Sequence, residues 1–249
     1  MQVIAVVSAA GGSGRTTLTA ALAALLAMRG RRVLALDLDP RNSLGMQLGL
    51  PLEEADGWAP RFLAGGNWNQ AAFRNSDGVQ VVPFGRVPPQ KLPAIEELAL
   101  GAPDWLQRRL NQLALPDDAI LLIDTDRLPS GYALQAINAA QVILNVLLPD
   151  AAAPGAARYA ELAAGSRPVH HVVNQLEALR PLQHDLMQLL RQELGGRLAS
   201  YSVHRDPAVP EAVASNRGLT AYAPNGQAAH DLQGLANWLL DLLGAGAHA

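Results

Sequence analysis

The chain has 249 residues, of which 49% are hydrophobic, and this is enough to bury the core of one α/β domain. Its formal net charge of −3 gives no general attraction for polyanions, so composition does not favour a nucleic-acid-binding protein. The absence of cysteine excludes disulfides, iron–sulfur clusters and thiolate-bound zinc.

Short apolar runs alternate with longer stretches rich in alanine and leucine along the chain. This alternation predicts one doubly wound, mostly parallel α/β domain over residues 1–243, with 244–249 as a frayed tail. We expect strands at residues 2–7, 32–38, 79–83, 119–124, 141–148, 169–174 and 200–204. We expect helices at residues 16–29, 104–114, 131–139, 155–164, 182–194, 207–217 and 227–243. The proline-rich stretch 84–103 is expected to be an irregular insertion.

Targeting segments are not expected. The first apolar run follows Met1 almost directly, without the basic region that begins a signal peptide. No apolar run reaches the ~20 residues that a membrane-spanning helix needs.

The most informative segment is Ser8-Ala-Ala-Gly-Gly-Ser-Gly-Arg-Thr-Thr17, which joins the first strand to the first helix. A glycine-rich turn at this place surrounds an anion with backbone N–H groups at the positive end of the helix dipole. The usual pattern is G-x-x-x-x-G-K-[ST]; here Ala9 replaces the first glycine and Arg15 replaces the lysine. We predict a phosphate-binding loop that consists of Gly11, Gly12, Ser13, Gly14, Arg15, Thr16 and Thr17.

The spacing of this loop resembles the K-G-G-x-G-K-T-T loop of the MinD/ParA family of ATPases. In that family the first lysine reaches the phosphates of a dimer partner, and the second is the ordinary P-loop lysine. Ala10 and Arg15 stand at these two positions, so both lysines are missing. A general drift towards arginine explains Arg15, since Lys91 is the only lysine beside 18 arginines, but it does not explain Ala10. Arginine is a planar fork and does not replace a compact ammonium group conservatively.

Carboxylates follow two further apolar runs, as Asp37 and Asp39 after one and Asp124 after the other. The resemblance implies that Thr16 ligates Mg²⁺, that Asp37 and Asp124 hold the metal's waters, and that Asp39 positions the attacking water. An aspartate at a strand end is also a common helix cap, but three such placements around one loop favour the functional interpretation. The family continues with D-x-P after the last strand, and Asp126 departs from that pattern.

The base of an ATP molecule is expected near two later segments. Asn174 ends a strand where family members place the side chain that reads the adenine edge, although an asparagine there is equally a turn residue. Asp206 falls in the family segment that flanks the base. We expect its neighbour His204 to be structural.

Several segments resemble the MinD-like proteins of bacterial cellulose secretion, the BcsQ (or YhjQ) family. They are Asp56–Ala59, Gly66–Trp68, Val81–Gly85, Val203–Asp206 and Leu235–Leu239. This resemblance implies a cytoplasmic homodimer that binds ATP and Mg²⁺ and is recruited to the inner membrane by partners. Those partners would be small regulatory subunits and the membrane-embedded cellulose synthase complex, without nucleic acid.

Three other interpretations remain open. A nucleotide-binding scaffold without turnover explains the loss of both lysines as well as a slow ATPase does, while Asp39 favours turnover. A partition ATPase would need a basic DNA-binding face, which the charge balance does not favour. A MinD-like positioning protein would end in a basic amphipathic anchor, but this chain has no lysine or arginine after Arg217.

Overall fold

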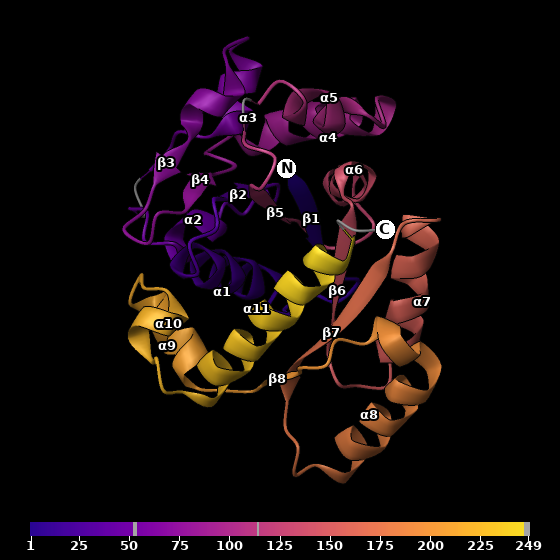
Figure 1. Ribbon diagram of the computed structural model, residues 1–249. Helices are drawn as coiled ribbons and strands as arrows, with labels where there is room; N and C mark the ends of the chain where they lie inside the picture. The colour runs from indigo at the N-terminus through magenta and orange to yellow at the C-terminus, as the bar shows by residue number, and fades with distance from the viewer. Residues whose placement is uncertain (52–53, 114, 247–249) are drawn as a thin grey trace.

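The computed structural model describes residues 1–51, 54–113 and 115–246. In this part of the chain eight strands form one sheet in the order β3-β4-β2-β5-β1-β6-β7-β8 (Figure 1). In chain order, strands β1 to β8 span Gln2–Val7, Val33–Asp37, Phe73–Arg74, Gln80–Val82, Ile120–Asp124, Val142–Leu147, Val169–Leu176 and Val203–His204.

The neighbouring strands are parallel except for the short edge pair β3–β4. Strand β1 lies between β5 and β6, with Val6 opposite Asp124 on one side and Leu144 on the other. Strand β2 pairs with β5 so that Asp37 stands opposite Asp124. The expected doubly wound, mostly parallel fold is confirmed, and its carboxyl edge gathers the ends of β1, β2 and β5.

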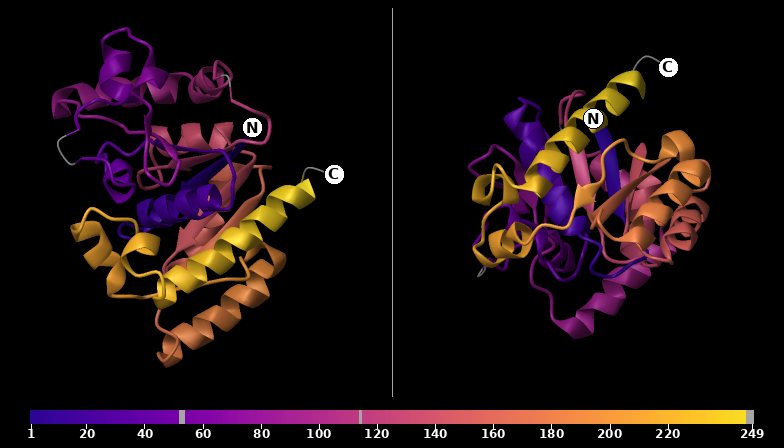
Figure 2. Two further views of the ribbon diagram at one scale, coloured as in Figure 1. Left: turned by 60° about the vertical axis from the view of Figure 1, so that its left-hand side comes forward. Right: turned by 90° about the horizontal axis from the view of Figure 1, so that it is seen from below.

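Helices cover both faces of the sheet (Figure 2). Helices α1 to α11 span Arg15–Met28, Leu44–Gln47, Trp58–Leu63, Leu92–Gly101, Trp105–Leu110, Gly131–Ala139, Ala153–Ala164, Pro181–Leu194, Ala208–Ala214, Leu219–Tyr222 and Gln227–Gly246. Short 3₁₀ turns occupy Trp68–Ala71, Pro89–Lys91 and Gly195–Arg197.

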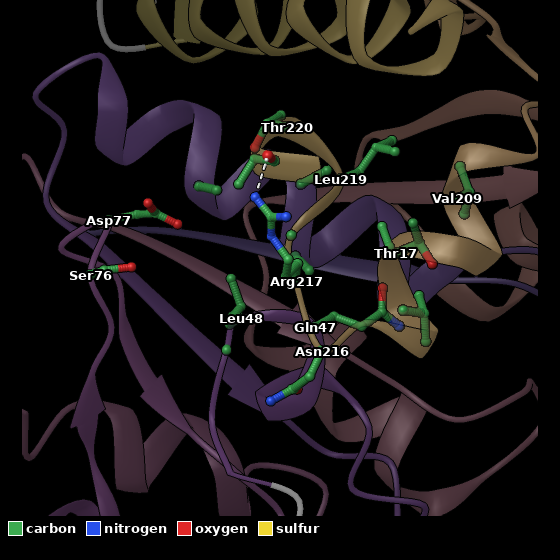
Figure 3. A pocket seen from close by; sticks show the side chains of 18 residues that line it. Thr17, Gln47, Leu48, Ser76, Asp77, Val209, Asn216, Arg217, Leu219 and Thr220 are labelled. Carbon is green, nitrogen blue, oxygen red and sulfur yellow. Dashed lines mark hydrogen bonds between the residues drawn. The ribbon is translucent and has the colours of Figure 1, made fainter. Parts of the chain in front are cut away.

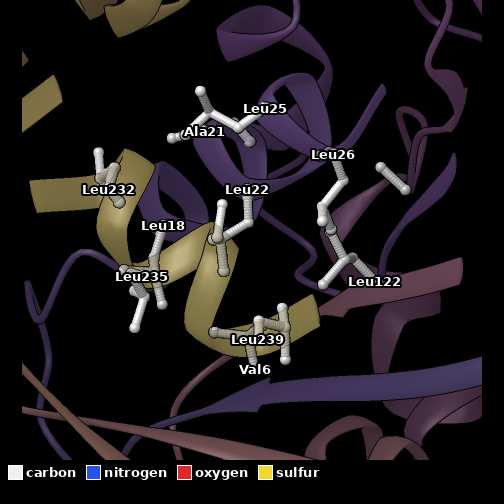
Figure 4. Close-up of a cluster of buried hydrophobic side chains, with 14 of the residues drawn as sticks. Val6, Leu18, Ala21, Leu22, Leu25, Leu26, Leu122, Leu232, Leu235 and Leu239 are labelled. Carbon is white, nitrogen blue, oxygen red and sulfur yellow. The ribbon is translucent and has the colours of Figure 1, made fainter. Parts of the chain in front are cut away.

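The alternation of side chains along β1 divides the core into two layers. Ile4 and Val6 point to the face covered by α1 and α11, whereas Val3, Ala5 and Val7 point to the face covered by α3 to α6. Figure 4 shows the first layer, where leucines of α1 and α11 meet above Val6 and Leu122. This packing fixes the start of α1, and therefore the glycine-rich loop, on the end of β1.

Several sequence predictions were wrong in detail. The stretch expected to be irregular contains helix α4, because Pro93 lies in the first turn, where a missing N–H costs no hydrogen bond. The helix expected at 104–114 ends at Leu110, and residue 114 lies outside the described residues. The helix expected at 207–217 ends at Ala214, just before Asn216, which has a left-handed φ of 51°.

The last helix packs against the core through Leu232, Leu235 and Leu239. It continues to Gly246, beyond the boundary expected at 243, and residues 247–249 lie outside the described part of the chain. No helix within residues 1–51, 54–113 and 115–246 has both the length and the apolar character needed to cross a membrane.

Candidate nucleotide site

The glycine-rich loop is open to an anion. Among the described residues, none accepts a recorded hydrogen bond from the backbone N–H groups of residues 11–17. Gly14 has a left-handed φ of 87°, and a Cβ added there would lie 2.2 Å from Nδ2 of Asn174. Only glycine therefore fits this turn, and its backbone presents a series of unpaired donors at the N-terminus of α1.

Arg15 does not extend from this loop, because its guanidinium is buried and bound to backbone carbonyls. Nε donates to the oxygen of Thr125 at 3.0 Å, and Nη1 donates to those of Ser8 at 3.3 Å and Ala10 at 3.0 Å. Burial lowers the pKa of the side chain from its ordinary value, with nearby carboxylates opposing the shift. Arg15 thus ties the loop to the segment after β5 through Nε and Nη1, while its Nη2 donates to none of the described residues.

Asp37 is a fully buried carboxylate that shapes the turn after β2. Its Oδ1 accepts from the N–H of Asp39 at 2.9 Å, and its Oδ2 accepts from the N–H of Leu44 at 3.0 Å. Burial and the neighbouring Asp124 raise its pKa well above the ordinary value. Each oxygen already has one donor, so Asp37 organises the segment that carries Asp39.

Asp124 is fully buried, and neither of its oxygens has a hydrogen-bond partner among the described residues. Burial raises its pKa to about 7. The Thr16 side chain moderates this rise but makes no hydrogen bond of normal geometry to the carboxylate. An orphaned buried carboxylate at the end of a strand is costly unless a cation or a water network satisfies it.

Asp39 is also buried, with 1% of its side chain exposed, but it is paired with Arg41. Arg41 Nε lies 3.1 Å from Oδ1 and 3.0 Å from Oδ2, and its Nη2 lies 2.5 Å from Oδ2. The Arg41 side chain itself is 64% exposed. Arg41 was not predicted from the sequence as a partner of Asp39, although it directly follows the Asp-x-Asp-Pro segment.

Asp126, the residue that departs from the family pattern, belongs to a separate arrangement. Its Oδ1 accepts from the hydroxyl of Ser130, whose oxygen in turn accepts from the N–H of Ala133 and caps helix α6. Burial raises the pKa of Asp126 to about 6. The segment after β5 therefore leads into a capped helix.

A cavity of about 910 Å³ lies beside the loop, between the end of β7 and helix α9. Asn174 lines it and donates from Nδ2 to the oxygen of Ser13 at 2.6 Å, while none of the described residues donates to its Oδ1. Asp206 lines the cavity too, but its oxygens accept from the N–H groups of Ala208 at 2.9 Å and Ala228 at 3.1 Å. Asn174 thus keeps an acceptor for a base, whereas Asp206 caps two helices.

A second cavity, of about 190 Å³, shares Thr17 and Gln47 with the first (Figure 3). Arg217 lies in its wall and donates to the oxygen of Ala221 at 2.9 Å. The cavity is small beside the first one, so the larger cavity is the better candidate for a nucleoside.

Two segments that resemble the cellulose-secretion proteins pack against each other behind the Asp37 turn. Trp58 is buried, donates from Nε1 to the oxygen of Asp37 at 2.7 Å, and stacks edge-on against Phe84. A Cβ on Gly57 would lie 2.3 Å from the backbone nitrogen of Gly85. This close contact explains both glycines and supports the turn that carries the site's carboxylates.

These residues fit a Mg²⁺-bound nucleoside triphosphate. The unpaired N–H groups of the loop suit phosphate oxygens, and the orphaned Asp124 beside Thr16 suits a cation. Within the described residues no three histidine or carboxylate side chains form a metal site by themselves. Mg²⁺ in such sites usually takes one or two protein ligands together with phosphates and waters.

Comparisons with known proteins agree with this geometry. The family model described as cellulose biosynthesis protein BcsQ matches residues 1–240. The chain belongs to the BcsQ family. BcsQ of Salmonella typhi is 29% identical over 248 residues, which cover 96% of this chain and 94% of the relative.

Relatives outside the BcsQ family share the fold. The chromosome-partitioning ATPase Soj of Thermus thermophilus is 29% identical over 244 residues, covering 94% of this chain and 93% of Soj. The septum site-determining protein MinD from Pyrococcus horikoshii, solved in complex with Mg-ADP, superposes with a TM-score of 0.79 at 21% identity, covering 98% of both chains. This BcsQ-family chain therefore has the MinD/ParA ATPase fold.

Proposed function

We propose that this BcsQ-family protein is an ATP-dependent dimeric switch or scaffold for cellulose synthesis and secretion, with slow or no ATP hydrolysis. Two features of the site carry the proposal. The loop N–H groups have no acceptor among the described residues, and the nearby Asp124 carboxylate has no donor there. The loop donors belong to the backbone, so they survive the loss of both family lysines.

The residues of this chain would divide the work of binding between them. The loop from Gly11 to Thr17 would hold the phosphates, and Asn174 would accept a hydrogen bond from the adenine amino group. Asp206 would contribute indirectly, by capping the helices that line the cavity. The Thr16 hydroxyl would ligate Mg²⁺, with Asp37 and Asp124 orienting its waters. Bound Mg²⁺ would neutralise charge on the phosphates.

Asp39 would position the attacking water if hydrolysis occurs. Turnover is expected to be slow, because Ala10 carries no charge and the Arg15 guanidinium is bound to three carbonyls. Loss of a transition-state cation typically lowers rates by about 10³-fold or more. Turnover of ATP by the purified protein faster than about one per second would contradict this part of the proposal.

The expected biological setting is the cytosolic face of the inner membrane. Membership of the BcsQ family supports a role with small regulatory subunits and the membrane-embedded cellulose synthase complex. Deleting the gene should reduce cellulose output, and fractionation should find the protein at the membrane only when the synthase is present. Unchanged cellulose output would refute this role.

A partition-type ATPase is the second candidate, and its supporting observation is the 29% identity to Soj over 94% of the chain. DNA binding distinguishes the two. A partition protein retains DNA in a nucleotide-dependent and salt-sensitive way, whereas this chain, with a net charge of −3, should not.

Titration calorimetry tests the binding proposal. A non-hydrolysable ATP analogue should release heat in the presence of Mg²⁺, with much weaker binding in EDTA. Absence of binding heat across several temperatures, with no thermal stabilisation by the nucleotide, would refute nucleotide binding altogether.

A further inference from the structure

Two cationic side chains lie near the carboxylates of the nucleotide site, and they differ in how freely they can move. Arg15 and Arg41 both act electrostatically on Asp124. Arg15 is 4% exposed and its guanidinium donates to three carbonyl oxygens. Moving Arg15 would leave the buried Thr125 carbonyl and the part-buried Ala10 carbonyl without a donor among the described residues, which is unfavourable, while the Ser8 carbonyl would keep the N–H of Leu128.

Arg41 has the opposite character. Its side chain is 64% exposed, and it binds Asp39 through Nε and Nη2. Its remaining nitrogen, Nη1, donates to none of the described residues. Because the Arg41 guanidinium is exposed, it can reach a second oxyanion, and water that enters beside the buried Asp39 must then satisfy the carboxylate that it leaves.

The backbone around Arg41 is better fixed than its side chain. The N–H of Arg41 donates to Asp39 Oδ1 at 2.9 Å, and the next residue, Asn42, accepts from the N–H of Gly85 at 3.0 Å. Arg41 therefore extends from an anchored turn, directly beside the carboxylate expected to orient water.

We propose that Arg41 is the mobile cation of the nucleotide site: it holds Asp39 while no nucleotide is bound and moves to the terminal phosphate when a triphosphate binds. This inference rests on the proposed nucleotide binding. A guanidinium binds a phosphate through two parallel hydrogen bonds, as it binds Asp39 now. Its departure frees Asp39 Oδ2 and leaves Oδ1 with only the backbone N–H of Arg41, so that Asp39 can accept hydrogen bonds from water. Arg41 would thus place a positive charge at the terminal phosphate from the chain that binds the nucleotide, whereas Ala10 offers none.

The test compares binding of ADP and of a non-hydrolysable ATP analogue, both with Mg²⁺, by calorimetry. Arg41→Gln should weaken binding of the analogue about 10-fold or more while changing ADP affinity less than about 3-fold, since ADP lacks the terminal phosphate. Arg41→Lys should recover only part of the loss, because an ammonium group cannot form the two-point contact.

A second variant has the opposite predicted sign. Asp39→Asn removes the group that holds Arg41 and should tighten analogue binding. In the double variant Asp39→Asn/Arg41→Gln this gain should disappear if it acts through Arg41, and persist if it reflects only the loss of a negative charge. Persistence of the gain would overturn the proposal.

Arg61→Gln is the matched control. Arg61 binds Asp56 with the same geometry, at 2.8 and 2.9 Å from Nε and 2.5 Å from Nη2, and it lines neither cavity described above. The Arg61→Gln variant should therefore bind ADP and the ATP analogue as tightly as the wild type does. If the wild type binds neither nucleotide, the proposed function fails. If the wild type binds both and Arg41→Gln weakens them equally or not at all, only the inference about Arg41 fails.

Discussion

The orphaned carboxylate of Asp124 should destabilise the nucleotide-free protein at neutral and alkaline pH. Its pKa is raised from 3.8 to about 7 by burial, so the native state resists ionisation more than the unfolded chain does. A carboxyl with a raised native pKa contributes full stability below pH 3.8, and that contribution is lost as the pH rises towards 7. Asp124→Asn removes this dependence because an amide does not titrate.

The size of the effect follows from the shift. About three pKa units correspond to roughly 4 kcal/mol between acid and alkaline pH, of which about 2–3 kcal/mol falls between pH 5 and pH 8. The unfolding free energy of Asp124→Asn minus that of the wild type should therefore be about 2–3 kcal/mol larger at pH 8 than at pH 5. Any constant cost of the buried amide cancels in this difference.

Urea unfolding at pH 5 and pH 8, in EDTA and without nucleotide, measures both free energies. Asp118→Asn is the control, because Asp118 is an exposed carboxylate whose side chain has no recorded contact within the described residues. An equal difference between Asp124→Asn and the wild type at both pH values would show that Asp124 does not have the raised pKa. An equal pH dependence of the control would also contradict the prediction.

Three further predictions concern the loop and its neighbours. Thr16→Ala should weaken binding of Mg²⁺-nucleotide, whereas Asp39→Ala should keep binding and abolish any turnover; calorimetry and phosphate release separate these effects, and an Asp39→Ala variant that cannot bind would misplace this residue. Arg15→Ala should lower the unfolding free energy by about 2–4 kcal/mol, because the carbonyls of Thr125 and Ala10 lose their donor and a buried side chain is removed, and a change below about 0.5 kcal/mol in urea unfolding would contradict this role of Arg15. Gly14→Ala should reduce thermal stability because its Cβ would meet Asn174 at 2.2 Å, whereas Gly11→Ala, with nothing within 4 Å of its Cβ, should keep the melting temperature of the nucleotide-free protein; equal melting temperatures of the two variants would argue against this geometry.

The sequence predicted the sheet well because apolar strands buried on both faces leave a continuous signal. It also predicted a turn between the first strand and the first helix, where Gly14 adopts a φ of 87° that other residues disfavour. Helix α4 was missed because the prolines in and around it suggested irregular structure, although Pro93, its one proline, stands in the first helical turn.

The side-chain pairs of the site could not be predicted from the sequence. Nothing in the order of residues indicates that Arg15 turns back to three carbonyls, or that Arg41 binds Asp39 while Asp124 stays unpaired. Such choices depend on which donors the folded chain leaves within a few ångströms. The capping role of Asp206 is similar, because one of its two helices begins more than twenty residues later.

The proposed function requires that ATP brings two copies of this chain together. Light scattering on the wild-type protein, with and without a non-hydrolysable ATP analogue and Mg²⁺, tests it most directly. We expect a rise towards twice the chain mass of 26.3 kDa with the analogue, and no such rise when EDTA replaces Mg²⁺. A mass that is the same in all three conditions, at analogue concentrations that saturate calorimetric binding, would contradict it.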